Sequence, residues 1–302
     1  MTLLVPPRRK GQTQEPLLSA AVRGMRPRQW LKNVLVAGAP FTAGVLFERD
    51  VLLTTLAAFV AFCLLSSSVY LANDARDVEE DRQHPTKRFR PIACGALPVN
   101  VAWALSATLA VAGLGLGFGT DPALGLTLVV YLAVQVGYTG GLKQQAVLDL
   151  AIVASGFLLR AIAGGVASDI TLSQWFLMVA SFGSLFIVAG KRYSELHALG
   201  RQGATRPSLL QYSESYLRFV WALAAALTVI SYSLWALEHG EAGSDLWATV
   251  SIGPFVLGLL RYAVDVDQGL AGAPEDIALR DRVLQLLGVL WLAFLGLAVF
   301  TA

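Results

Sequence analysis

Long apolar runs limit what this chain can fold into. Nine of them reach or approach the roughly 20 residues that a helix needs to cross a bilayer. Because lipid offers the backbone no hydrogen-bond partners, such runs must form helices. The predicted spans are Leu31–Phe47, Val51–Ala72, Val99–Phe118, Ala123–Tyr138, Ala146–Ala167, Gln174–Gly190, Tyr216–Leu237, Leu246–Val264 and Val283–Ala302. The sequence therefore predicts an all-α polytopic membrane protein.

Composition supports this prediction and excludes a soluble globular protein. Of the 302 residues, 55% are hydrophobic and 15% charged, against roughly 25% charged in a soluble domain. No segment between the spans is long enough to fold alone. We predict one membrane domain over residues 15–302 with polar loops at 73–98, 191–215 and 265–282. A tail of residues 1–14, rich in Pro and Arg, is predicted to be disordered.

Basic residues are distributed very unevenly between the loops. With the N-terminus in the cytoplasm, 21 of the 23 Lys and Arg lie on the inner side; Arg49 falls outside and Arg160 lies within a span. Positively charged loops stay in the cytoplasm. The sequence thus predicts a multi-pass protein of the plasma (inner) membrane with a cytoplasmic N-terminus. Its long polar loops, and any active site on them, would face the cytoplasm.

Acidic residues follow directly on the second apolar run. If the helix continues, Asn73, Asp77 and Asp81 are spaced i, i+4, i+8, and Asp74 lies beside them. Like charges at that spacing each cost a helix roughly a few tenths of a kcal/mol, so a bound cation is favoured. Ligands that are all oxygen favour Mg²⁺. We predict Mg²⁺ on Asn73, Asp74, Asp77 and Asp81, with the three aspartates as catalytic residues.

A basic turn comes shortly after these acids. Lys87, Arg88 and Arg90 lie between Pro85 and Pro91. Alone, these cations would be interpreted as charges that set the membrane topology. Beside a metal site they supply the second half of what a diphosphate needs, because the metal binds some oxygens and the cations bind others. We therefore predict that they bind phosphate.

Other polar residues near the inner face are further candidates. Arg160, inside a span, is a candidate anion partner, or else a structural partner of a nearby acid or carbonyl. Lys143 could contact a phosphate or only set the topology. Asp149 could approach Mg²⁺, but an acid favouring its helix N-terminus is the preferred interpretation. The predicted substrate-binding set is Lys32, Lys87, Arg88, Arg90, Tyr138, Lys143, Arg160, Lys191, Arg192 and Tyr193.

These motifs resemble a known family. Asn73-Asp74-x-x-Asp77-x-x-x-Asp81, at the end of a second span, is similar to the first aspartate-rich motif of the UbiA superfamily of intramembrane prenyltransferases. The segment Arg26-Pro27-x-x-Trp30-x-Lys32-Asn33 resembles the start of that superfamily's fold. The resemblance implies a UbiA-like bundle of nine transmembrane helices and a Mg²⁺-dependent transferase.

One position departs from the superfamily pattern. Members generally carry a second pair of aspartates at the inner end of the sixth helix. This chain has Gly190-Lys191-Arg192-Tyr193-Ser194-Glu195 there, with two cations and one acid. Fixed positive charge suits a donor with an additional phosphate held apart from its diphosphate.

One branch of the superfamily is similar over nearly the whole chain, the actinobacterial decaprenyl-phosphate phosphoribosyltransferases. Matching segments include Arg160–Gly165, Arg261–Asp267 and Pro274–Asp281. The resemblance implies 5-phosphoribosyl 1-diphosphate as donor, a polyprenyl (decaprenyl) phosphate as acceptor and diphosphate as product, for precursors of cell-wall arabinan. It implies membrane lipid as a partner and no nucleic acid, and it allows a homo-oligomer. Glu275 and Asp276 are interpreted as the acidic first turn of a helix. A role of this segment in closing the ribose site is the alternative.

Two other functions stay open. One is a UbiA-type prenyltransferase that joins a prenyl diphosphate to an aromatic acceptor; Lys191 and Arg192 at the second acidic position argue against it. The other is a transporter of anionic solutes. Transporters place charges at the membrane midplane, whereas only Arg160 lies deep here.

Overall fold

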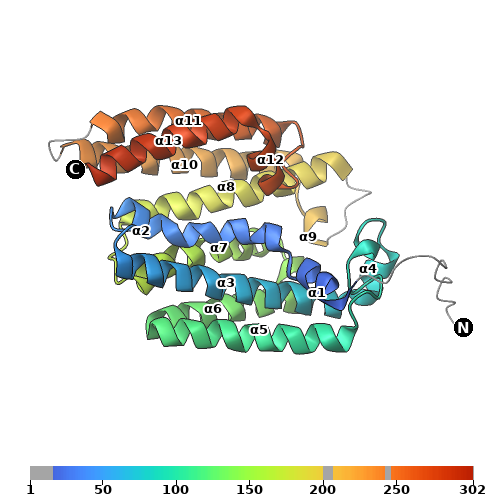
Figure 1. The fold of residues 1–302 in the computed structure, drawn as a ribbon. Helices are drawn as coiled ribbons and strands as arrows, with labels where there is room; N and C mark the ends of the chain where they lie inside the picture. The colour runs from blue at the N-terminus through green and yellow to red at the C-terminus, as the bar shows by residue number, and fades with distance from the viewer. Residues whose placement is uncertain (1–15, 200–206, 242–245, 302) are drawn as a thin grey trace, which may run out of the picture.

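The computed structural model describes residues 16–199, 207–241 and 246–301, and every regular element in these ranges is helical. The α-helices are α1 (Leu17–Met25), α2 (Gly38–Thr42), α3 (Arg49–Arg76), α4 (Val78–Gln83), α5 (Val99–Thr120), α6 (Pro122–Gly140), α7 (Leu148–Ala167), α8 (Gln174–Leu199), α9 (Pro207–Leu210), α10 (Glu214–Glu241), α11 (Leu246–Asp267), α12 (Pro274–Arg280) and α13 (Arg282–Phe300), and the 3₁₀ segments are η1 (Pro27–Ala37), η2 (Lys87–Phe89) and η3 (Leu142–Gln144). The long helices form one bundle (Figure 1). The predicted all-α fold is confirmed, and the predicted tail of residues 1–14 lies outside the described ranges.

Eight of the described helices are long and apolar enough to cross a membrane: α3, α5, α6, α7, α8, α10, α11 and α13. Each corresponds to one predicted span. The remaining predicted span, Leu31–Phe47, falls on η1, a 3₁₀ segment of 11 residues, and on α2, a helix of 5 residues. Pro40 within α2 has no N–H to donate, which limits regular helix there. The number of nine crossings and the side of the N-terminus remain predictions.

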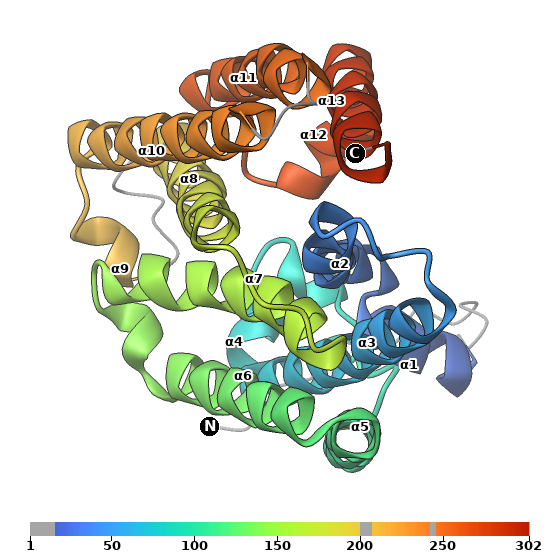
Figure 2. The same cartoon turned by 90° about the vertical axis from the view of Figure 1, so that its left-hand side faces the viewer.

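Two groups of helices pack around a common centre. One consists of α3, α5, α6 and α7, with η1 against α3 and α7; the other consists of α8, α10, α11 and α13. They meet where α8 contacts α7 and where α13 contacts α2. Figure 2 shows α2, α7, α8, α10 and α13 around that centre. Each group has its own hydrophobic core, with Phe62 and Leu128 in the first and Phe186 and Tyr262 in the second.

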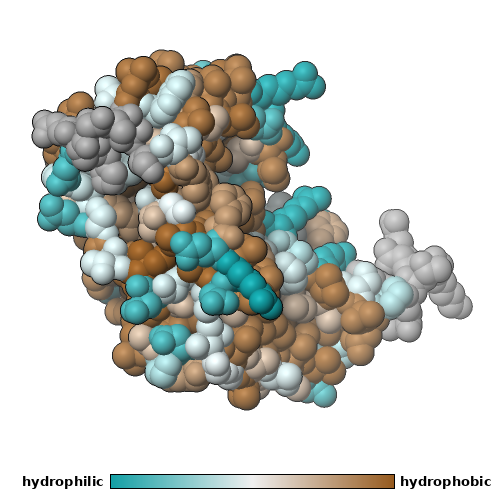
Figure 3. All heavy atoms as spheres, turned by 60° about the vertical axis from the view of Figure 1, so that its left-hand side comes forward, coloured by the Kyte–Doolittle hydropathy of each residue, from teal (hydrophilic) through white to brown (hydrophobic). Residues whose placement is uncertain are grey.

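Large apolar side chains also cover the outside of the bundle. Val283, Leu286 and Val289 on α13 are 54–64% exposed, and Val111 on α5 is 73% exposed. Figure 3 shows a face covered mainly by hydrophobic residues, with hydrophilic ones in smaller groups. Such a surface is costly in water, but lipid tails solvate it.

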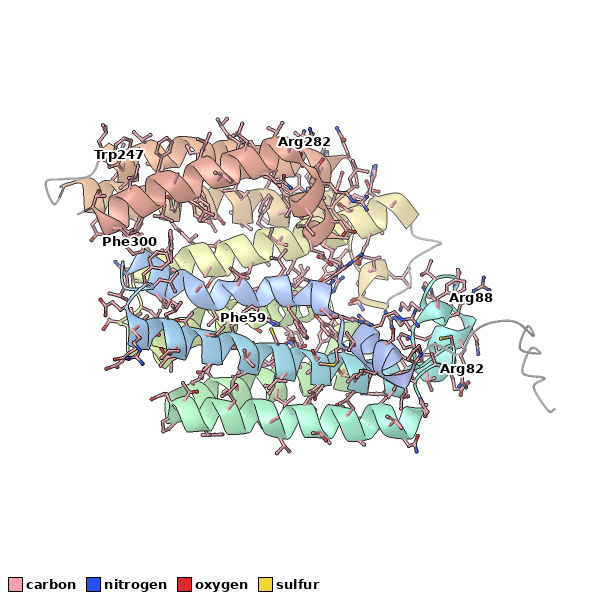
Figure 4. All side chains as sticks on the ribbon, in the orientation of Figure 1. Phe59, Arg82, Arg88, Trp247, Arg282 and Phe300 are labelled. Atoms are coloured by element: carbon pink, nitrogen blue, oxygen red, sulfur yellow. The ribbon has the colours of Figure 1, made fainter. Side chains whose placement is uncertain are left out.

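Four short helices lie toward one end of the bundle, called the polar end below. α1, α4, α9 and α12 lie there (Figure 1). Arg82 and Arg88 mark this end in Figure 4, whereas Trp247 and Phe300 lie at the opposite end. The short helices α4, α9 and α12, which come next in the chain after α3, α8 and α11, thus lie at one end, as their predicted location on one side of the membrane requires.

Candidate active site

The acidic stripe keeps its helical spacing, although α3 ends at Arg76. The Asp77 N–H donates to the Asn73 carbonyl at 2.9 Å, and the Asp81 N–H donates to the Asp77 carbonyl at 2.9 Å. Asp77 forms the junction with α4, which begins at Val78. Because hydrogen bonds join residues four apart on both sides of the junction, the helical spacing of Asn73, Asp77 and Asp81 is kept through it.

Two carboxylates of this segment are buried and bound to arginines. Asp74 and Asp81 are each 3% exposed. Arg90 Nη1 donates to Asp74 Oδ1 at 2.9 Å and to Asp81 Oδ2 at 2.7 Å. Arg26 Nη2 donates to both oxygens of Asp74, at 2.7 and 2.8 Å. The predicted phosphate ligand Arg90 thus bridges two predicted metal ligands, and Arg26 is a member of the site for which no role was predicted.

The other two predicted ligands are held more loosely. Asn73 Oδ1 accepts a hydrogen bond from the Thr139 hydroxyl at 2.7 Å. Asp77 Oδ2 lies 3.6 Å from Lys143 Nζ, and the Asp77 side chain is 29% exposed, against 4% for Asp74 and Asp81. Lys143, predicted to bind substrate, therefore lies beside the acidic stripe. Asp77 is its most accessible aspartate.

The acidic stripe offers Mg²⁺ an incomplete set of ligands. No group of three or more His, Cys, Asp and Glu side chains in the described residues is placed to hold a metal ion. Mg²⁺, however, is usually bound through one or two carboxylates together with substrate phosphates and water. The oxygens of Asn73 and Asp77 fit that mode.

A cavity of about 1040 Å³ lies between the two groups of helices. Its lining includes Lys32 and Glu275 at the polar end and Thr42 and Leu46 toward the other end, so it runs along the bundle. Most of the lining is apolar. The polar side chains at its mouth are those of Lys32, Tyr138, Lys191, Arg192 and Glu275. Tyr138 precedes Thr139, which binds Asn73, so the mouth adjoins the acidic stripe.

Glu275 connects α12 to η1 at this mouth. Gln29 Nε2 donates to Glu275 Oε1 at 2.7 Å, and Lys32 Nζ lies 3.7 Å from Oε2. Lys32 also donates to Gln29 Oε1 at 2.5 Å. Burial acts to raise the pKa of Glu275, but the hydrogen bond from Gln29 and the charge of Lys32 outweigh it and lower this pKa below its ordinary value. Glu275 is therefore ionised at neutral pH.

Arg192, although it lines the cavity, is neutralised by two acids. It is 3% exposed, with Nε 3.0 Å from Asp149 Oδ2 and Nη1 3.0 Å from Glu195 Oε2. Asp149 also accepts hydrogen bonds from the hydroxyl of Tyr212 at 2.5 Å and from that of Ser208 at 3.3 Å. Burial, and next the hydrogen bond to this carboxylate, raise the pKa of the Tyr212 hydroxyl. Asp149 lies in the first turn of α7, in agreement with its interpretation as an acid near a helix N-terminus. Its pairing with Arg192 was not predicted.

Arg160 is buried between η1, α3, α6 and α7. Its Nε donates to Asn33 Oδ1 at 2.7 Å, Nη1 to the Gly156 carbonyl at 2.6 Å and Nη2 to the Tyr131 hydroxyl at 3.1 Å. No described carboxylate lies within ion-pair distance of it. These contacts match the structural alternative.

The remaining predicted residues lie apart from the mouth. Arg88 lies over the exposed ring of Phe89 in η2, at the polar end, next to Lys87. Tyr193 is fully buried, and its hydroxyl accepts a hydrogen bond from Arg218 at 2.6 Å. The structure therefore brings Lys32, Tyr138, Lys191 and Arg192 to the cavity, but it places Tyr193 in the core of the second group of helices.

Comparison with known proteins identifies the family of this chain. The model of the UbiA prenyltransferase family matches residues 34–275. A decaprenyl-phosphate phosphoribosyltransferase of Mycobacterium tuberculosis is 55% identical over 295 residues, which cover 95% of this chain and 97% of that protein. One from Corynebacterium glutamicum is 47% identical, with 99% and 92% covered.

A solved structure shows the same fold. The UbiA homologue from Archaeoglobus fulgidus bound to GPP and Mg²⁺ superimposes with a TM-score of 0.71 over 94% of this chain and 100% of that one, at 17% identity. At that identity the match concerns the fold alone. The family model and the close relatives, however, extend over most or nearly all of the sequence, and this chain belongs to the UbiA prenyltransferase family.

Proposed function

We propose that this protein transfers 5-phosphoribose from 5-phosphoribosyl 1-diphosphate to decaprenyl phosphate and releases diphosphate. The observation that carries this proposal is the 47–55% identity, over nearly the full length, to curated relatives named for that activity.

The cavity supports two substrates of opposite character. At the mouth, Lys32 and Lys191 supply positive charge for the phosphates of the donor and of the lipid. Farther in, side chains such as Phe157, Phe176 and Ile187 make an apolar channel for part of a polyprenyl chain. Arg192 contributes less charge than its sequence position predicts, because Asp149 and Glu195 neutralise it.

Asn73 and Asp77 would hold Mg²⁺ together with oxygens of the donor diphosphate. When bound, the ion would stabilise negative charge on the departing diphosphate. Asp74 and Asp81, the other two predicted ligands, hold Arg90 in this structure, so Mg²⁺ would share their carboxylate oxygens with this arginine. Their present contacts position Arg26 and Arg90 beside the stripe.

The reaction is a displacement at the anomeric carbon. A lipid phosphate oxygen forms the new bond to C1 as the bond between C1 and the diphosphate oxygen breaks, through a transition state with oxocarbenium character. Because the lipid phosphate is already an anion at neutral pH, no strong general base is required. The protein contributes by positioning the substrates and by stabilising charge. Lys32 and Lys191 at the mouth would orient the phosphates of the donor and of the lipid.

The polar end would face the cytoplasm of a plasma membrane. The basic loops meet there, and positively charged loops stay on the inner side. This orientation gives the site access to a water-soluble sugar donor, while the lipid acceptor enters from the bilayer.

A direct test is transfer by the purified protein in lipid nanodiscs. We expect label from phosphoribosyl diphosphate to appear in a lipid product when decaprenyl phosphate and Mg²⁺ are present. A parallel reaction offers a prenyl diphosphate and 4-hydroxybenzoate. Product in the second reaction alone would reject the proposal in favour of a prenyltransferase.

The apolar channel gives a second prediction. Ala180→Phe adds a ring inside the cavity, so the polyprenyl chain should lose room and turnover of decaprenyl phosphate should fall roughly tenfold or more. An acceptor of two isoprene units should be affected much less. Ala107→Phe, the same change at an exposed position of α5, is the control and should leave both rates unchanged. Equal losses for both acceptors would contradict this use of the cavity.

A further inference from the structure

Glu275 is an unexpected residue at the mouth of this cavity. It is the one acidic side chain among the described residues that line the cavity. Both proposed substrates bring phosphates to the same region, and a carboxylate repels them. A carboxylate at the mouth of the cavity is therefore expected to bind a substrate group other than phosphate.

The two oxygens of Glu275 differ in their contacts. Oε1 accepts a hydrogen bond from Gln29 at 2.7 Å. Oε2 is buried and accepts no hydrogen bond from any described residue. Lys32 Nζ, at 3.7 Å, is too far for one. Buried polar atoms are nearly always hydrogen-bonded, so an exception at a candidate active site indicates a missing donor.

Lys32 Nζ and Glu275 Oε2, 3.7 Å apart, are close enough for one hydroxyl to hydrogen-bond with both. An oxygen placed about 2.8 Å from each would accept from the ammonium and donate to the carboxylate. An ionised carboxylate only accepts hydrogen bonds. Of the groups in the two substrates, the ribose hydroxyls are donors, whereas the phosphates at neutral pH are acceptors.

We propose that Glu275 and Lys32 bind a ring hydroxyl of the ribose donor and thereby select ribose over deoxyribose. This inference rests on the proposed function, because it names how the same site recognises its sugar. It assigns Glu275 a direct contact with substrate in addition to its contact with Gln29. α12 then carries a specificity-determining residue as well as closing the mouth.

The test measures binding of stable analogues rather than turnover. Methyl α-D-ribofuranoside 5-phosphate and its 2-deoxy and 3-deoxy forms compete with the donor, and their inhibition constants give the preference for each hydroxyl. In the unmodified protein we expect one deoxy form to bind roughly tenfold to a hundredfold more weakly than the ribo form. In Glu275→Gln that ratio should fall toward one. In Asp276→Asn, a change at the exposed neighbouring acid, it should persist.

Several outcomes would overturn the inference. If Glu275→Gln weakens all three analogues equally, the residue only holds α12 to η1. Equal binding of the three analogues by the unmodified protein overturns it without any variant, even if Glu275→Gln does not fold. If the unmodified protein turns over phosphoribosyl diphosphate but shows no such preference, this inference fails and the proposed function stands. If it neither binds nor turns over that donor, both fail.

Discussion

Asp77→Asn is expected to lower turnover by about a hundredfold or more while leaving the protein folded. Asp77 is the most accessible aspartate of the stripe, and its described ion-pair contact is Lys143 at 3.6 Å. Losing its charge therefore removes little from the folded state. The proposed site for Mg²⁺ would lose its only carboxylate that is not held by an arginine, so the Mg²⁺ concentration for half-maximal rate should rise. Initial rates over a Mg²⁺ titration measure both effects.

Glu79→Gln is the matched control for this prediction. Glu79 lies two residues farther along, in the first turn of α4, and its side chain is 74% exposed and paired with Arg82 on the surface. Neutralising it changes the net charge of the segment by the same amount, so turnover and Mg²⁺ requirement should stay near those of the unmodified protein. Unchanged kinetics in Asp77→Asn, with thermal unfolding also unchanged, would remove Asp77 from the active site.

The membrane spans and the acidic stripe were predictable because each follows from short-range physics. Lipid forces an apolar run such as Val99–Phe118 into a helix, whatever it packs against. The spacing of Asn73, Asp77 and Asp81 survives the end of α3 because the backbone hydrogen bonds continue into α4. Residues 31–47 are also largely apolar, but they contain Lys32, Asn33 and Pro40. Their sequence does not reveal the 3₁₀ geometry of η1, which packs against α3 and α7.

The partners of the charges were not predictable. Arg192 pairs with Asp149, 43 residues earlier in the chain, and nothing in the local pattern connects them. An arginine near an acidic stripe has the same sequence signal whether it binds a substrate phosphate or, like Arg90, the aspartates themselves. Tyr193 was predicted to bind substrate because it is close to Lys191 in the sequence. Two residues along a helix, however, turn a side chain by about 200°, so Tyr193 faces away from Lys191.

Gly164→Ala should be severely destabilising, because α7 and η1 touch at this residue. A Cβ on Gly164 would lie 1.7 Å from the carbonyl oxygen of Val36 and 2.8 Å from its carbonyl carbon. Backbone atoms cannot rotate away as a flexible side chain can, so η1 must move. We expect a loss of about 3 kcal/mol or more in the free energy of unfolding. Turnover should fall as well, since η1 carries Lys32 and also Asn33, which binds Arg160.

Gly115→Ala separates this effect from the general consequence of replacing a helical glycine. Nothing lies within 4 Å of a Cβ at Gly115 in α5, so the change only adds a better helix former, worth up to about 1 kcal/mol. Thermal unfolding in the same detergent should show a midpoint at or above that of the unmodified protein for Gly115→Ala, and one far below it for Gly164→Ala. Equal midpoints would mean that η1 does not pack against α7 as closely as the structure has it, and the position of Lys32 at the mouth would fall with that contact.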